Sequence, residues 1–155
     1  GDMLDQSEIP TSGSASMSGK AVFNVAYRYN QANSDYGVTQ YSSNATVNGT
    51  FNWGSGSYSG QLDFTNFDSG NSLVSNAGFT SFSVSLAGSG ATYAGSLNDT
   101  NNGWTREAVI AGALYGNNTP VESGGRISVG LSKSGSLGTS GANDFYMAEG
   151  IYLID

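Results

Sequence analysis

Apolar and polar residues alternate along residues 14–29, and this alternation decides the fold class. One side of the segment is mostly serine, asparagine, lysine and arginine, whereas the other side carries Ala15, Met17, Ala21, Phe23, Val25, Tyr27 and Tyr29. A period of two residues is typical of a β-strand with one buried face, because successive side chains point to opposite sides of a strand. A helix would need a period of about 3.6 residues, and no stretch of a dozen residues has that period.

The alternation returns in seven further segments, most of them separated by short turns. Glycines at 54–56 and 88–90 suit hairpin connections, and 98–103 is a loop rich in Asn and Asp. Longer connections are expected at 65–78 and 134–143. The second strand begins as early as residue 36, and the clear parts of the eight strands are 15–29, 45–53, 58–64, 82–86, 91–97, 107–115, 124–132 and 145–154.

Eight strands in series can close into a cylinder, which leaves no unpaired edge. Eight is also the strand number at which side chains just fill the interior of a barrel. We therefore predict an all-β fold, a soluble eight-stranded antiparallel up-and-down β-barrel with an apolar interior. Residues 9–155 would form this single domain, preceded by a frayed, disordered leader at 1–8. A sandwich of two sheets fits the same alternation and is the structural alternative.

An outer-membrane barrel would reverse the two faces, with apolar side chains toward lipid and a polar, charged interior. The chain has only 12 acidic and 5 basic residues, too few to supply such an interior as well as the surface. We therefore expect the apolar face to lie inside and the domain not to insert into a membrane. No run of 18 apolar residues could form a transmembrane helix.

The composition also limits the chemistry. Cysteine and histidine are both absent, which removes disulfides, zinc–thiolate sites, thiol nucleophiles and the usual general base. A net charge of −7 would repel a phosphate backbone, so nucleic acid is a poor partner. The oxygen-rich segment 98–102 holds one carboxylate and is interpreted as a turn rather than a calcium site. We expect a protein that is not an enzyme and has no metal or cofactor.

The segment 112–125 has the highest density of special residues. Leu114 and Tyr115 are adjacent, so one points inward and the other outward. Glu122 is interpreted mainly as a carboxylate that accepts backbone N–H groups and fixes the turn, with contact to a ligand as the other reading. The glycine pair would relieve crowding or form a bulge. The residues of this signature to which we assign a structural role are Gly112, Tyr115, Gly116, Glu122, Gly124 and Gly125.

Several motifs, in order, resemble the β-barrel domains of transferrin-binding protein B-like proteins. IPTSGSA at 9–15 followed by MSG at 17–19 is similar to their opening P-x-x-G-x-A-x-Y-x-G, with Met17 in place of the aromatic residue. GQLDF at 60–64 is similar to G-x-x-x-V-D-F, and YAG at 93–95 to F-x-G. VIAGALYG at 109–116 followed by ESGG at 122–125 resembles G-x-F-Y/F-G-P-x-A-x-E-x-G-G, with one residue more in the turn.

The resemblance implies a surface-exposed lipoprotein of the Gram-negative outer membrane, or a secreted relative. Proteins of this kind include transferrin- and lactoferrin-binding lipoproteins, the complement factor H-binding lipoprotein and the haem-capturing hemophilins. By this resemblance the chain would be a non-enzymatic module that binds a host or environmental protein, in iron or haem acquisition. A lipid anchor would belong to the precursor, and we expect the domain to be a monomer.

Aromatic residues near strand ends are the best candidates for a ligand-binding role. We select Tyr36, Tyr41, Phe67 and Trp104, because exposed rings are enriched in binding hot spots. Such rings can also plug the end of a barrel, and both roles stay open. Two other functions remain as alternatives: a structural barrel domain of a larger envelope protein without a ligand site of its own, and a carbohydrate-binding module.

Overall fold

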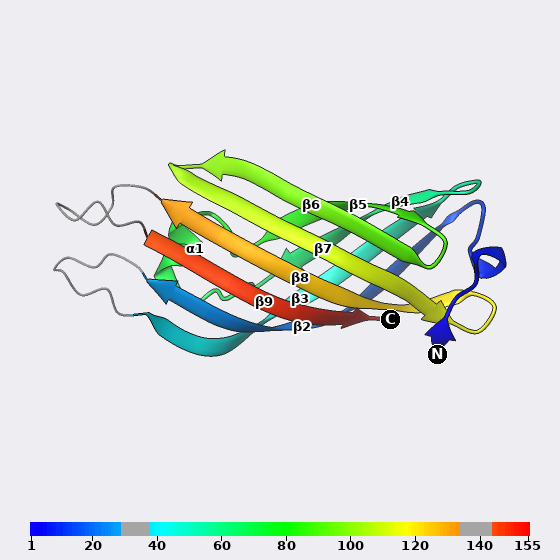
Figure 1. Cartoon of the computed structure of the whole chain (residues 1–155), viewed down its shortest axis with the longest axis horizontal. Helices are drawn as coiled ribbons and strands as arrows, with labels where there is room; N and C mark the ends of the chain where they lie inside the picture. The colour runs from blue at the N-terminus through cyan, green and yellow to red at the C-terminus, as the bar shows by residue number, and fades with distance from the viewer. Residues whose placement is uncertain (29–37, 134–143) are drawn as a thin grey trace, which may run out of the picture.

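The computed structural model describes residues 1–28, 38–133 and 144–155, and its strands close into a barrel (Figure 1). Each strand pairs antiparallel with the next, and β9 pairs with β2, so the eight-stranded up-and-down barrel is confirmed and the sandwich is ruled out. The barrel strands are β2 (Ser14–Arg28), β3 (Thr39–Trp53), β4 (Tyr58–Thr65), β5 (Phe82–Ser89), β6 (Thr92–Asn101), β7 (Trp104–Gly116), β8 (Pro120–Lys133) and β9 (Asp144–Ile154).

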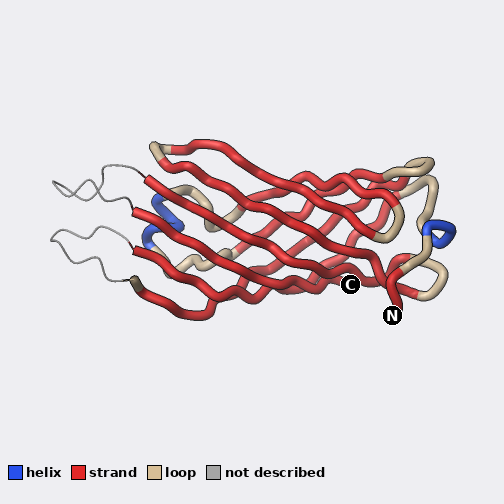
Figure 2. The backbone as a smooth tube through the Cα atoms, in the orientation of Figure 1, coloured by secondary structure: helices blue, strands red, loops and turns tan. Residues whose placement is uncertain are grey.

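The two ends of the barrel are built differently (Figure 2). Short connections at 54–57, 90–91 and 117–119 lie at the end that also holds both termini. At the opposite end, residues 66–81 form a longer connection that contains α1 (Ser72–Asn76). We call this the α1 end. None of the described helices is long and apolar enough to cross a membrane.

The prediction of a loop at 98–103 is wrong, because β6 and β7 continue through most of this segment. The strands pair as far as Asn101 and Trp104, which leaves a turn of two residues. Its central residues, Asn102 and Gly103, have φ values of 51° and 80°, the left-handed backbone that a tight hairpin of this kind requires. Residues that favour loops are therefore accommodated in the ladder, with Asp99 opposite Arg106.

The structure also differs from the frayed leader predicted at 1–8. A short strand, β1 (Asp2–Met3), pairs with the end of β7, and a 3-10 turn, η1 (Gln6–Glu8), follows. Leu4 between them is 4% exposed and belongs to the core. The segment is held because β7 extends beyond β6, so its edge is free to pair with β1.

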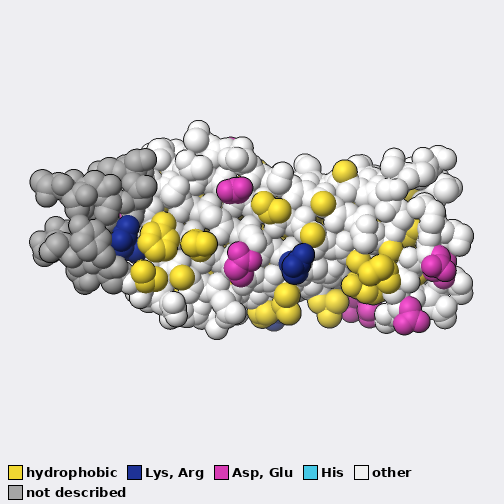
Figure 3. Space-filling model, in the orientation of Figure 1, with side chains coloured by type: hydrophobic (Ala, Val, Ile, Leu, Met, Phe, Trp, Pro, Cys, Tyr) yellow, Lys and Arg dark blue, Asp and Glu magenta, His cyan; other side chains and the backbone are white. Residues whose placement is uncertain are grey.

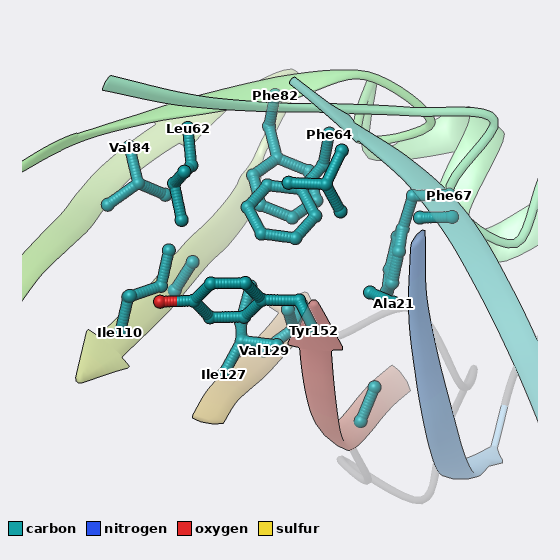
Figure 4. Packing of buried hydrophobic residues seen from close by; sticks show 14 of the residues in the cluster. Ala21, Leu62, Phe64, Phe67, Phe82, Val84, Ile110, Ile127, Val129 and Tyr152 are labelled. Atoms are coloured by element: carbon teal, nitrogen blue, oxygen red, sulfur yellow. The ribbon is translucent and has the colours of Figure 1, made fainter. Parts of the chain in front are cut away.

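The apolar face of each strand lies inside, where large side chains pack against one another (Figure 4). The Phe79 and Phe82 rings stack with centroids 4.1 Å apart, and Phe64 stacks on Phe82 at 4.8 Å. Phe67 meets Phe23 edge to face at 4.9 Å. Aromatic pairs of this geometry contribute about 0.5–1.5 kcal/mol each beyond the area that they bury. The barrel is therefore a packed core rather than a channel.

One row across four strands explains two glycines of the 112–125 signature, Gly112 and Gly125. In register, Tyr93 on β6 faces Gly112 on β7, Gly112 faces Gly125 on β8, and Gly125 faces Tyr152 on β9. The two tyrosines lean over the two glycines from either side, and their hydroxyl oxygens lie 2.6 Å apart. A Cβ on Gly112 would lie 2.5 Å from the Tyr93 hydroxyl and closer still to that of Tyr152. Only glycine leaves room for this pair.

We therefore expect Gly112→Ala to lower the free energy of unfolding by about 1–3 kcal/mol, the usual range for an overpacked core. Gly130→Ala is the matched control, because a Cβ at this β8 position meets no atom within 4 Å. It should be neutral or stabilising by up to about 1 kcal/mol. Urea denaturation measures both, and equal effects of the two substitutions would contradict this account.

Candidate functional site

Three of the four aromatic residues selected from the sequence lie at the α1 end. Tyr41 is near the start of β3, Phe67 is in the 66–81 connection, and Trp104 is the first residue of β7. Tyr36 lies outside the described residues. The expectation that these rings are exposed is wrong for Phe67 and Trp104, which are both 0% exposed, and Tyr41 is half-buried. Their role in ligand binding stays a prediction.

Phe67 and Trp104 hold the 66–81 connection across the mouth of the barrel. The Phe67 ring contacts those of Phe82 and Tyr146, with centroids 5.4 and 5.8 Å away. The indole N–H of Trp104 donates a hydrogen bond of 3.0 Å to the side-chain oxygen of Asn76 in α1. Both rings lie on the inner side of the connection, packed against the barrel interior, so this end of the barrel is plugged.

A buried carboxylate, which was not among the residues selected from the sequence, fixes the same connection. Asp68 is 8% exposed and accepts hydrogen bonds from Tyr146 at 2.9 Å, from Ser43 at 3.1 Å and from Tyr41. Asn71 donates to the Tyr41 hydroxyl at 2.8 Å. We call these five residues the Asp68 network. It ties the connection to β3 and β9, and it satisfies polar groups that would be costly to bury alone.

Local interactions then shape α1. The side chain of Asn71 accepts the backbone N–H of Leu73 at 2.8 Å, which caps the first turn of the helix. Leu73 and Val74 are fully buried beneath it. The backbone N–H of Phe67 donates to the Thr80 carbonyl at 2.9 Å, which closes the base of the connection. A helix of five residues is not stable alone, so these contacts determine its position.

Arg106 fixes the far side of the connection. Its guanidinium forms two hydrogen bonds with Asp99, at 2.7 and 2.8 Å, and a third N–H donates to the carbonyls of Ala77 at 3.3 Å and Gly78 at 3.1 Å. The Arg106 hydrogen bonds hold the pKa of Asp99 below its ordinary value. The connection is thus anchored from β3, β6, β7 and β9.

The outer surface of the anchored connection consists of small polar residues. We call it the α1 platform, formed by the exposed residues Ser69, Gly70, Ser72, Ser75, Asn76 and Gly78. Its hydroxyl and amide groups can donate and accept hydrogen bonds. Among the described residues no cluster of three or more His, Cys, Asp or Glu could hold a metal ion. The nearby carboxylate of Asp68 already accepts three donors.

The remaining signature residues lie at the other end of the barrel. Tyr115 is half-buried and pairs with Met3, and the ladder shifts register at Gly116, where the turn toward Pro120 begins. In the described part of the chain, the ion pair of Glu122 is with the amino group of Gly1, at 3.6 Å. This differs from the backbone contacts expected of Glu122. Gly124 lies on the outer side of β8, beside Leu153.

The signature also contains a buried polar residue that the sequence analysis missed. Ser123 donates to the Ala113 carbonyl at 2.9 Å, which uses its only proton, and its oxygen lies 2.6 Å from the Tyr93 hydroxyl. The Tyr93 proton is therefore donated to Ser123, and the Tyr152 proton to Tyr93. A serine at an inward position beside two glycines is the available sequence signal, but its partners come from distant strands.

Burial governs the titration of the core tyrosines. Desolvation raises the pKa of Tyr58 to about 12, and it is also the main reason why the pKa values of Tyr93, Tyr146 and Tyr152 are raised. For Tyr146 the negative charge of Asp68 adds to the effect. These phenols remain neutral hydrogen-bonding groups at physiological pH.

Fold and site together define a closed, filled β-barrel with one plugged end. No family model matches the chain, and no curated protein matches it. A similar solved structure is a Trp-to-Ala mutant of the vaccine antigen transferrin-binding protein B from Haemophilus parasuis Hp5, with 16% sequence identity and a TM-score of 0.46. The match covers 100% of this chain and 29% of that one, so this chain spans less than a third of that protein. The barrel assignment rests on the strand pairings themselves.

We expect Asp68→Ala to loosen the α1 end. The substitution leaves the buried hydroxyl groups of Tyr41 and Tyr146 without their acceptor, at a cost of about 1–3 kcal/mol for each unsatisfied group. Hydrogen exchange should accelerate in residues 66–81 more than in the barrel strands. Asp63→Ala is the control, since that exposed carboxylate binds Ser83 and Gln61 on the outer wall. Unchanged exchange at 66–81 in the Asp68 variant would contradict the anchoring role.

The raised tyrosine pKa values predict alkaline unfolding. Because the folded pKa lies above the unfolded value of about 10, the stabilisation is complete below pH 10 and is lost as the pH rises toward the folded pKa. Each buried tyrosine then contributes about 1.4 kcal/mol of lost stability per pH unit. Tyr152→Phe should reduce the loss of stability by the contribution of one tyrosine, about 1.4 kcal/mol per pH unit. The slope is measured by urea unfolding at stepped pH, and full phenolate absorbance from a still-folded barrel at pH 10–11 would refute the prediction.

Proposed function

We propose that this chain is a non-enzymatic binding module that contacts a protein partner with its α1 platform. The observation that carries the proposal is the Asp68 network, which fixes an irregular surface connection on the end of a filled barrel. Binding residues are commonly carried on loops that a rigid scaffold positions. A surface that is already ordered also loses less conformational entropy when it binds.

The packed interior supports contact on the outside of the barrel. A ligand within the barrel would have to displace fully buried side chains such as Phe51, Phe64 and Leu62. The exposed serine and asparagine groups of the platform suit hydrogen bonds to a polar protein surface. The net charge of −7 favours a partner that carries a basic patch, by attraction over a distance of roughly 8–10 Å at physiological salt.

The motif resemblance supports a finer version of this function. The module would capture a host protein in iron or haem acquisition, on an outer-membrane lipoprotein or as a secreted protein of a Gram-negative bacterium. Direct haem ligation would fall to tyrosine or methionine. Met17 is buried, and the hydroxyls of Tyr146 and Tyr152 are engaged in the core, so these three residues are not open to haem; Met3 and Met147 are exposed on the outer surface. We propose capture of a carrier protein rather than of haem itself.

The two alternatives differ from this proposal in what they need at the α1 end. A carbohydrate-binding module would use exposed rings, whereas Phe67 and Trp104 are turned inward. A structural barrel would need no anchored platform, since a two-residue hairpin is enough to connect β6 and β7 at the same end.

The test is binding of the purified chain to a panel of host serum proteins that includes iron and haem carriers. Ser75→Arg places a bulky cation on the exposed face of α1 and should weaken binding at least roughly tenfold, as expected at the centre of an interface. Ser85→Arg on the outer face of β5 is the control and should leave binding unchanged. Equal binding by both variants would remove the platform from the interface. A Soret shift on mixing the chain with haemin would contradict capture through a carrier.

A further inference from the structure

The outer wall of the barrel is apolar on one side only. Large hydrophobic side chains lie exposed on β2, β7, β8 and β9, but none of the described residues of β4, β5 or β6 adds to them. Figure 3 views this side, and hydrophobic side chains lie along it. Four of them are on β9 and its neighbour β2: Val22, Met147, Ile151 and Leu153. We call the outer faces of β8, β9 and β2 the β9 wall.

Strand register arranges the β9 wall in rows. In the middle row, Arg126 on β8 faces Ile151 on β9, which faces Val22 on β2. In the next row toward the α1 end, Glu149 lies between Ser128 and Asn24. Ile151 is 61% exposed, so an aliphatic side chain projects from the centre of the wall with a cation beside it and a carboxylate one row away.

The charges of this wall and of the adjoining outer face of β7 nearly balance, unlike those of the whole chain. The outward cations are Lys20, Arg28 and Arg126, and the outward anions are Glu107, Glu122 and Glu149, with Asp155 at the edge of the wall beside Ser18. The net charge of the chain is −7, so the excess of acidic groups lies elsewhere. Two copies of this acidic protein would repel each other least if they approached through this side.

Two shallow hollows lie beside the aliphatic row, on the side toward the α1 end. One, of about 470 Å³, is lined by Val22, Asn24, Arg126, Glu149 and Ile151 among others. The second, of about 630 Å³, lies between Ala26, Gln40 and Met147 and shares Asn24 and Glu149 with the first. The wall thus presents projecting aliphatic groups next to depressions of mixed polarity, which is the relief that a self-complementary surface needs.

We propose that the β9 wall is a homodimer interface occupied by a second copy of this chain. A twofold axis in the plane of contact brings Arg126 of each copy to Glu149 of the other, so the two ion pairs form together. The same axis places Ile151 and Val22 near their own symmetry mates, because a line that passes midway between Arg126 and Glu149, at right angles to the line joining them, runs close to both aliphatic residues. In the described part of the chain Arg126 has no ion pair, and Glu149 accepts only the Ser128 hydroxyl, at 2.7 Å.

This inference is independent of the proposed function and departs from the monomer expected from the sequence. The contact is centred on the middle rows of the barrel, so the α1 platforms remain uncovered at the barrel ends. A dimer would therefore carry two platforms, and a partner with two matching sites would be held by both.

Sedimentation equilibrium of the full chain, from micromolar to millimolar concentration, tests the dimer. The mass should rise from 15.9 kDa toward twice that value. Ile151→Asp should raise the dimer dissociation constant at least tenfold, whereas Ser59→Asp on the outer face of β4 should not change it. Both sites are exposed, and circular dichroism confirms that each variant is folded. A wild-type chain that stays monomeric throughout, or an equal effect of the two variants, overturns the proposal.

Charge exchange tests the pairing itself. Arg126→Glu and Glu149→Arg each place two like-charged pairs in a homodimer, so each variant alone should dissociate at least tenfold more readily. An equimolar mixture of the two variants forms a heterodimer in which both pairs are again opposite in charge, and it should associate to within a few-fold of wild type. A mixture no tighter than the separate variants overturns the Arg126–Glu149 contact. Binding of a different protein to the wall, with the chain itself monomeric, overturns the dimer.

Discussion

The contact between Tyr93 and Tyr152 above Gly112 and Gly125 determines how this barrel can be filled. The interior of an eight-stranded barrel is just wide enough for side chains, so two large rings fit in one layer only where their neighbours lack a Cβ. The row continues in the same manner on the other side, where the Tyr58 ring lies over Gly88. Gly88, Gly112 and Gly125 are therefore core positions beneath tyrosine rings rather than turn residues. The need for glycine at 112 and at 125, which face each other on β7 and β8, sets the distance between these two residues of the signature.

A filled interior has consequences for both ends and for the wall. Because the rings occupy the barrel, its polar groups must be satisfied inside, as in the chain of hydroxyls from Tyr152 through Tyr93 to Ser123. At the α1 end the same requirement produces the Asp68 network, in which a carboxylate serves the hydroxyls of two strands. The order of the α1 platform thus depends on the same kind of buried polar contact that completes the core.

Strand positions and the apolar interior could be predicted because alternation is a local property of the sequence. The Asp68 network could not, since Tyr41 and Tyr146 lie 27 and 78 residues away along the chain. The burial of Phe67 and Trp104 was missed for a related reason: a ring near a strand end can turn inward or outward, and only the path of the 66–81 connection decides. The loop prediction at 98–103 failed because it relied on the preference of Asn and Asp for loops, whereas β6 and β7 pair through most of this segment.

On β9, the outward side chains are more apolar than the barrel fold requires. Closure of the barrel needs apolar side chains on its inner face, which Tyr146, Ala148, Tyr152 and Ile154 provide. Its outer face has no such requirement, and on β3 the equivalent positions are Ser, Thr, Asn and Gln. Met147, Ile151 and Leu153 therefore cost solubility without contributing to the core. A contact that covers them accounts for their presence, and the nearly balanced charges beside them make a second copy the most compatible cover.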